Sequence, residues 1–222
     1  MLLLCERTQP SGLLQMGTIE GQRFESDQFE ELIQGLIDNK FGCIENFVPV
    51  NVIIGLRDRL ISLRDAGEMQ SAQIGNRHVH REDQSVRGDC IKWLQADSKN
   101  LFEALFLNKI SSFIKHLNRT CFTSIQGFES HYASYSKNGF YKRHLDQFNN
   151  DSGRKYSVVL YLNEKWLDPD GGLLSLYPAG AMQENIAPMA GRLVFFKSDE
   201  MEHEVFPSAT RDRISIAGWL KG

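Results

Sequence analysis

The 222-residue sequence has few cysteines, no long apolar run and no surplus of charge of one sign. Its four cysteines lie far apart and form no CxxC pair, which excludes a zinc ribbon and is expected of reduced thiols. No stretch is long enough to span a membrane, and no basic region precedes the short apolar start that a secretory signal would need. We therefore expect a cytoplasmic protein without membrane partners.

The balance of charge also argues against a nucleic-acid partner. The 25 Lys and Arg residues are offset by 28 Asp and Glu residues, for a net charge of -3. A chain of this charge has no general attraction to a polyanion. The sequence also lacks the HExxH, Walker, GxSxG and dinucleotide-binding motifs, so it gives no support to the enzyme classes that carry them.

Apolar residues recur at helical spacing in the first half of the sequence. They predict a first helix that starts at a capping-box pair, Asp27 and Glu30, and ends at Gly42. A second helix is predicted up to Gly67, and a third from about residue 98 to 117. The residues before Asp27 show no period, so we expect an irregular lead-in.

Residues 68–92 are polar and without a period, and we interpret them as a long loop, which in a compact domain is usually functional. Beyond residue 127, short β-rich runs alternate with turn residues, as in an antiparallel sandwich or barrel. Helices packed on such a sandwich make an α+β domain. The predicted strands are His131–Tyr135, Tyr141–His144, Tyr156–Leu162, Leu173–Tyr177, Arg192–Lys197, His203–Val205 and Arg213–Trp219.

Two polar residues at the end of one predicted strand indicate a metal site. His144 and Asp146 are two positions apart, so in a strand they project from the same face. A His-x-Asp pair supplies two of the three ligands of the facial triad that holds non-haem Fe(II), and a second histidine must come from elsewhere. His203, in a later β-like run, is the candidate. An isolated His-x-Asp is more often a surface pair, so this assignment needs further support.

That support comes from a third predicted strand, where Arg213 and Ser215 share one face. A guanidinium offers a planar fork to a carboxylate, and a serine hydroxyl adds a donor. Beside a metal, this pair calls for an anionic co-substrate. Arg211, two residues earlier, could bind the co-substrate in place of Arg213.

These residues lie within segments that resemble the 2-oxoglutarate and iron dependent prolyl 4-hydroxylases, especially those acting on hypoxia-inducible factor and their bacterial relatives. The resemblance extends over residues 27–219, and its set of motifs in this order is specific. It is carried by VRGDCIKWL, YASYSKNGFYKRHLDQF, RKYSVVLYLNEKW, DGGLLSLYP and GRLVFFKSDEMEHEVFPSATRDRISIAGW.

The resemblance implies an α+β fold with a double-stranded β-helix core, a cupin-like jelly roll, supported by N-terminal helices. It implies one domain over residues 1–222, in which residues 1–126 give helical support and the substrate loop and residues 127–222 form the catalytic core.

The resemblance also implies roles for single residues. His144, Asp146 and His203 would be the catalytic iron ligands, and Arg213 would bind the distal carboxylate of 2-oxoglutarate. Tyr161 would be the second partner of that carboxylate. The spacing from His203 to Arg213 is one residue longer than in the animal enzymes, which keeps Arg211 as the alternative.

Further members of the site follow from the same resemblance. Tyr135 matches the tyrosine beside the iron and the target proline, and Ser215 completes the co-substrate set. Arg87 and Asp89 lie in the loop that closes over the substrate peptide in relatives, and Arg154 matches an arginine at the pocket edge.

The implied reaction uses Fe(II), 2-oxoglutarate and O2, with stimulation by ascorbate, to hydroxylate C4 of a prolyl residue and to release succinate and CO2. The implied partner is an intracellular protein with a target proline, such as elongation factor Tu or a peptide like that of hypoxia-inducible factor, which also raises a role in oxygen sensing. One alternative is the same chemistry on a free amino acid or on alkylated nucleic acid. Another, from a different class, is a catalytically inactive binding module.

Overall fold

The computed structural model describes residues 12–72, 86–147 and 153–222 of the chain. The helices among them are α1 (Gly12–Asn39), α2 (Val50–Asp65), α3 (Leu101–Thr120) and the short 3-10 turn η1 (Asp168–Asp170). The strands are β1 (Phe41–Ile44), β2 (Gln70–Ser71), β3 (Asp89–Trp93), β4 (Gly127–Tyr135), β5 (Tyr141–His144), β6 (Arg154–Tyr161), β7 (Leu174–Tyr177), β8 (Glu184–Ile186), β9 (Leu193–Lys197), β10 (Glu202–Val205) and β11 (Arg213–Lys221).

The strands form two antiparallel sheets. The larger has seven strands in the order β1-β9-β6-β11-β4-β3-β2, and the smaller has four in the order β5-β10-β7-β8. One apolar cluster joins Val194 and Phe196 of the larger sheet to Leu174 and Leu176 of the smaller, so the two sheets face each other. This arrangement is the expected α+β fold with a jelly-roll core.

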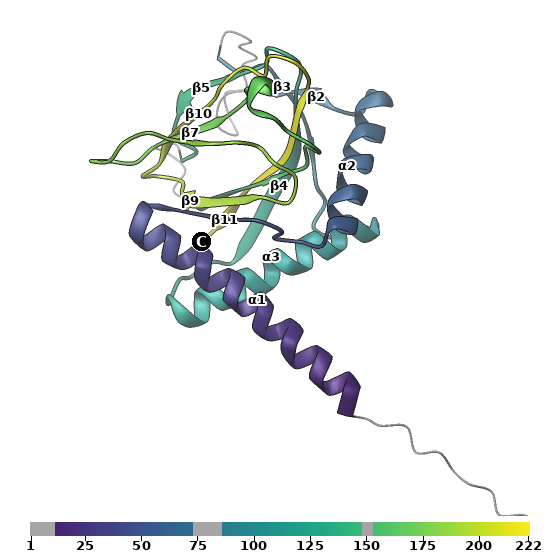
Figure 1. Cartoon of the computed structure of the whole chain (residues 1–222), viewed down its shortest axis with the longest axis vertical. Coiled ribbons are helices and arrows are strands. Elements are labelled where there is room, and N and C mark those ends of the chain that lie inside the picture. Colours follow the sequence, from purple (N-terminus) through teal and green to yellow (C-terminus); the bar gives the residue numbers. More distant parts are fainter. Residues whose placement is uncertain (1–11, 73–85, 148–152) are drawn as a thin grey trace, which may run out of the picture.

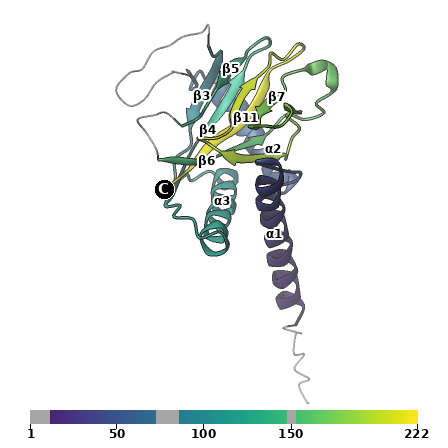
Figure 2. The ribbon, with the colours of Figure 1, turned by 90° about the vertical axis from the view of Figure 1, so that its left-hand side faces the viewer.

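The helices cover the outer face of the larger sheet. Figure 2 shows α1 and α3 beneath the strands, and in Figure 1 α2 lies at the right of the molecule, in contact with α3. A second apolar cluster joins Leu32 of α1, Leu60 of α2 and Phe113 of α3 to Phe195 and Ile216 of the sheet. Both faces of the larger sheet are therefore buried, which explains why β9 is apolar at consecutive positions.

The first helix departs from the expectation at both ends. It begins at Gly12, within the expected irregular lead-in, and ends at Asn39, before Gly42. Its N-terminal part extends away from the sheets (Figure 1), and Gly21 and Arg23 there are exposed, so at these two positions no buried apolar residue marks the helix in the sequence. Asp27 lies inside the helix rather than at its cap. Among the described residues, no helix is both long and apolar enough to cross a membrane.

Gly42 has a different role from the predicted helix stop. It lies in β1, where a side-chain carbon would collide with the carbonyl oxygen of Leu32 in α1. The helix itself ends through Lys40, whose φ of 71° is left-handed. The glycine therefore allows α1 to approach the edge of the larger sheet closely.

Residues 68–92 are not wholly a loop. They contain β2 and most of β3, which pair with each other and extend the larger sheet, while residues 73–85 lie outside the described part. In β3 the buried position is occupied by the acidic residue Asp89. The strand therefore lacks the alternation of apolar and polar residues by which a strand is usually predicted. Strand β8 was also missed, because its exposed positions carry Glu184 and Asn185 and only Ile186 is buried.

A buried histidine lies inside the barrel, among aromatic side chains. His131 of β4 is 3% exposed, and its ring lies 5.0 Å from that of Trp93 and 5.4 Å from that of Trp219. Its Nδ1 has no hydrogen-bond partner among the described residues. Burial lowers the pKa of His131 from 6.5 to about 4, so the ring is neutral near pH 7.

We expect His131 to make the fold sensitive to acid. The unfolded chain takes up this proton near pH 6.5 and the folded chain only near pH 4, so stability is unaffected above pH 6.5 and falls as the pH decreases from 6.5 to 4. Between about pH 7 and about pH 4.5 the wild type should lose about 2.5 kcal/mol more of its free energy of unfolding than His131→Phe. Urea unfolding of both proteins at both pH values measures this. Equal losses would contradict the prediction.

Candidate metal centre and co-substrate pocket

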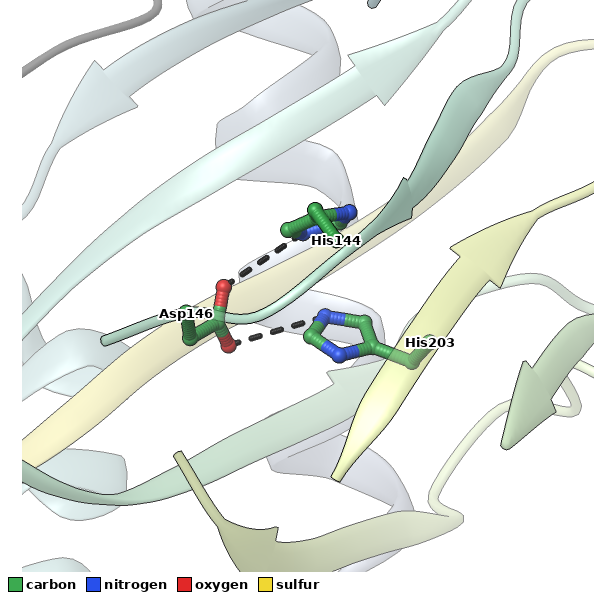
Figure 3. A group of neighbouring side chains, drawn as sticks. All are labelled: His144, Asp146 and His203. Atoms are coloured by element: carbon green, nitrogen blue, oxygen red, sulfur yellow. Dashed lines mark ion pairs between the residues drawn. The ribbon is translucent and has the colours of Figure 1, made fainter. Parts of the chain in front are cut away.

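Three predicted ligands meet where the smaller sheet faces the larger one. His144 ends β5, Asp146 follows two residues later, and His203 of β10 is paired in register with His144. The Nε2 atoms of His144 and His203 lie 3.5 and 3.6 Å from separate carboxylate oxygens of Asp146 (Figure 3). One possible ligand atom from each residue lies within 4.8 Å of the others, so the group could hold a metal ion.

Hydrogen bonds set both histidines in the same protonation form. The Nδ1 of His144 lies 2.7 Å from the carbonyl oxygen of Lys142, and the Nδ1 of His203 lies 3.1 Å from that of Met201. A carbonyl oxygen can only accept, so each Nδ1 must carry its proton and donate. In the neutral form of each ring the lone pair is then on Nε2, on the side of Asp146, and this tautomer is the one that binds a metal through Nε2.

Asp146 stays ionised in this site. Burial on its own would raise its pKa, but His203, His144 and a hydrogen bond from Ser157 together lower it well below the usual range. The Ser157 hydroxyl lies 2.7 Å from the Asp146 carboxylate and 2.8 Å from the hydroxyl of Ser198. Burial lowers the pKa of His203 to about 4, although Asp146 opposes this shift. Near neutral pH the site thus offers neutral imidazole and a carboxylate, the donor set of the Fe(II) facial triad.

The predicted co-substrate residues line the inner face of the larger sheet. Arg213 of β11 is paired in register with Tyr135 of β4, and Ser215 with Tyr161 of β6. The Arg213 guanidinium carbon lies 5.2 and 5.0 Å from the ring centres of Tyr135 and Tyr161. The structure therefore brings these four residues together.

Arg213 is a buried cation without an acidic partner among the described residues. Its side chain is 2% exposed, and its Nε donates to the carbonyl oxygen of Gly172 at 2.9 Å. The hydroxyl of Tyr161 nearby is buried and forms no hydrogen bond with the described residues. A buried charge is costly unless it is paired, so this pocket fits an anion such as the carboxylate of 2-oxoglutarate.

The alternative arginine lies elsewhere. The side chain of Arg211 is 40% exposed on the outside of the barrel, where it lies over the ring of Trp166. It donates to the carbonyl oxygen of Glu164 at 2.7 Å and pairs with Asp170 at 3.4 Å. Its charge is therefore already compensated, unlike that of Arg213.

Arg154, another arginine of the expected site, lies next to the candidate metal centre. It pairs with Glu129 at 3.1 Å, covers the ring of Trp219 at 3.5 Å and reaches the carbonyl oxygen of Asp146 at 3.4 Å. Arg154 therefore lies beside the backbone of Asp146, and its role at the edge of the pocket stays a prediction.

The structure places Arg87 and Asp89 differently from the expectation. Asp89 belongs to β3 rather than to a loop, and its side chain has no exposed surface. Both of its carboxylate oxygens accept hydrogen bonds from Arg87, at 2.7 and 2.6 Å. The two residues are therefore engaged with each other at the wall of the barrel.

Sequence reasoning missed a residue in this wall. The Tyr141 ring stacks on that of His144, with 3.6 Å between the ring centres. The two residues are three positions apart, which places them on opposite faces of a regular strand. The register of β5 against β10 is shifted between His203 and Val205, so the regular alternation does not apply. No sequence signal identifies such a shift.

Comparisons with known proteins identify the family of the chain. Residues 130–221 match the family model of the 2OG-Fe(II) oxygenase superfamily. The chain is 29% identical to prolyl hydroxylase EGLN3 of Mus musculus over 212 residues, which cover 90% of this chain and 87% of the mouse protein.

Two solved structures are similar over nearly their whole length. A Pseudomonas putida prolyl-4-hydroxylase is 30% identical, with a TM-score of 0.79 over 87% of this chain and 98% of that one. A prolyl hydroxylase from Trichoplax adhaerens, solved with a peptide fragment of the hypoxia-inducible factor oxygen degradation domain, is 28% identical, with a TM-score of 0.80 over 98% of this chain and 96% of that one. These similarities confirm the expected fold and family: the chain belongs to the 2OG-Fe(II) oxygenases, enzymes that use Fe(II), 2-oxoglutarate and O2.

Proposed function

We propose that this protein is a prolyl 4-hydroxylase that acts on a prolyl residue of another protein. The observation that carries the proposal is the placement of a facial-triad donor set and an unpaired buried arginine inside one barrel. The prolyl hydroxylases among its relatives, one of them bound to a peptide, support this substrate class. A cytoplasmic protein such as elongation factor Tu, or a peptide like that of hypoxia-inducible factor, is the proposed partner.

In this proposal His144, Asp146 and His203 hold Fe(II). When bound, the iron and 2-oxoglutarate would supply the oxidative chemistry, in which one oxygen atom of O2 enters a prolyl C–H bond and the other enters the succinate that forms, with CO2, from 2-oxoglutarate. The carbonyl oxygens of Lys142 and Met201 keep each imidazole in its metal-binding form. Such outer partners also orient the ligands.

Arg213 and Tyr161 hold the far carboxylate of 2-oxoglutarate. The guanidinium provides charge-assisted hydrogen bonds, and the tyrosine hydroxyl provides a neutral donor. Burial of both groups keeps water from the carboxylate, which strengthens the interaction. Tyr135, in register with Arg213 and 5.2 Å from its guanidinium carbon, would line the same pocket.

We expect His203→Ala to abolish tight metal binding. Loss of an outer partner of a ligand typically costs 10- to 100-fold in affinity, so loss of a ligand should cost more than about 100-fold. The measurement is titration of the purified protein with Mn(II), followed by electron paramagnetic resonance of the free ion. His116→Gln is the control, because His116 is also buried but pairs with Glu30 of α1. Metal binding by His203→Ala at wild-type affinity would refute the triad.

We expect Arg213→Gln to weaken the use of 2-oxoglutarate. Loss of one charged partner of a buried carboxylate costs about 2 kcal/mol or more, so KM for 2-oxoglutarate should rise about 30-fold or more. Arg211→Gln, which removes an already paired outer cation, should change KM less than about 3-fold. Succinate release at increasing 2-oxoglutarate concentration measures both. The reverse order would move the carboxylate site to the outer surface beside Trp166.

The substrate class is tested directly with three candidate substrates. We expect a proline-containing peptide from elongation factor Tu or from hypoxia-inducible factor to gain one oxygen atom on a prolyl residue, located by tandem mass spectrometry. Free proline should react far more slowly, because only a peptide can use contacts beyond the metal. His203→Ala is the inactive control. Equal turnover of free proline and of the peptides would favour the small-molecule alternative.

A further inference from the structure

The wall of the proposed metal site contains a stack of side chains that the reaction does not yet explain. The rings of Tyr141 and His144 are 3.6 Å apart and inclined by 17°. The Nδ1 of His144 donates a hydrogen bond to the carbonyl oxygen of Lys142. This bond fixes the position of Nδ1, so the main motion left to the imidazole ring is a tilt of its plane. The His203 ring also contacts His144, at 4.2 Å between ring centres, but its plane is inclined by 54°, which is too steep to keep the imidazole from tilting. The parallel Tyr141 ring is the contact that restrains it.

Tyr141 is itself held by a cation. The guanidinium carbon of Arg87 lies 4.4 Å from the Tyr141 ring centre. Because the imidazole at 3.6 Å covers one face of that ring, the guanidinium lies over the other face. The guanidinium donates two charge-assisted hydrogen bonds, of 2.7 and 2.6 Å, to the carboxylate of Asp89, which is fully buried. The order of the stack is Asp89, Arg87, Tyr141 and His144.

The backbone fixes the same order. Arg87 forms an antiparallel bridge with Tyr141. Next to it, the Lys142 amide donates to the carbonyl oxygen of Val86 at 2.9 Å, and the Gly88 amide donates to that of Phe140 at 3.0 Å. The segment before β3 is therefore paired with β5, and the stack does not depend on flexible side chains alone.

We propose that Tyr141 is a positioning residue for the metal ligand His144, and that the Arg87 and Asp89 pair holds Tyr141 in place. This rests on the proposed function, in which His144 binds the metal. Since both oxygens of Asp89 are bonded to Arg87 inside the wall, the pair acts on the metal site through Tyr141. Its effect on a peptide substrate is indirect.

The test is the Mn(II) affinity of the full chain in four variants. Tyr141→Leu removes the ring and should weaken binding about 10- to 100-fold, the range for outer partners of a ligand. Tyr141→Phe keeps the ring and should stay within about 3-fold of the wild type, which is rescue by the conservative change. Arg87→Met leaves Tyr141 but removes the cation, and should weaken binding about 10-fold.

Arg143→Met is the matched control. Arg143 also belongs to β5 and also covers a tyrosine ring, that of Tyr177 at 3.8 Å, but it is half exposed and paired with Glu202. Its Mn(II) affinity should equal that of the wild type. The spectrum of bound Mn(II) gives a second readout, since a tilted His144 should alter it in Tyr141→Leu and Arg87→Met but not in Arg143→Met.

The outcomes separate this proposal from the function on which it rests. If His203→Ala loses Mn(II) while Tyr141→Leu and Arg87→Met bind it like the wild type, the triad stands and the positioning role is overturned. If Tyr141→Phe is as weak as Tyr141→Leu, the hydroxyl rather than the ring is responsible, which also overturns it. If Tyr141→Leu fails to fold, the Mn(II) affinity of Arg87→Met is the test. Wild-type affinity in that variant would then refute the positioning role.

Discussion

The alternation of side chains along β11 is the constraint on which the fold and the site both depend. The strand lies at the centre of the larger sheet and is paired along its length with β4 and β6. Ile214 and Ile216 face the helices, whereas Arg213 and Ser215 face the inside of the barrel. A slip of one residue would exchange these faces, placing a cation in the apolar core and isoleucines in the pocket. The packing of the helices therefore also keeps the cation in the pocket.

The proposed metal ligands belong to the opposite sheet, and the site exists only where the two sheets meet. His144 and His203 are neighbours on β5 and β10, and their pairing brings both rings to one place. Ser157 reaches Asp146 from the larger sheet and joins the two halves by a hydrogen bond. The apolar side chains between the sheets thus determine how far the proposed ligands lie from the Arg213 cation.

Sequence patterns predicted what local spacing can encode. Seven of the eight strands from residue 127 onward were expected, all but β8, and His-x-Asp with a later histidine indicated the cluster that the structure brings together. The sequence patterns failed for segments whose exposed or buried positions do not carry the residue types that such positions usually carry. In α1 the described residues Gly21 and Arg23 are exposed, and in β3 Asp89 occupies a buried strand position that an apolar residue usually takes. The stacking of Tyr141 on His144 depends on a register shift, which is a property of two paired strands and not of either sequence alone.

The hydrogen bonds of the two histidines have a consequence for the design of such sites. Each imidazole donates to a carbonyl oxygen two residues earlier in its own chain segment, Lys142 for His144 and Met201 for His203. The tautomer is thus encoded in two tripeptides and does not require a carboxylate from a distant element, as many metal-bound histidines do. Transplanted as extended strands into another barrel, these tripeptides would carry their metal-ready form with them. The host scaffold would need to supply only their spacing and a nearby carboxylate.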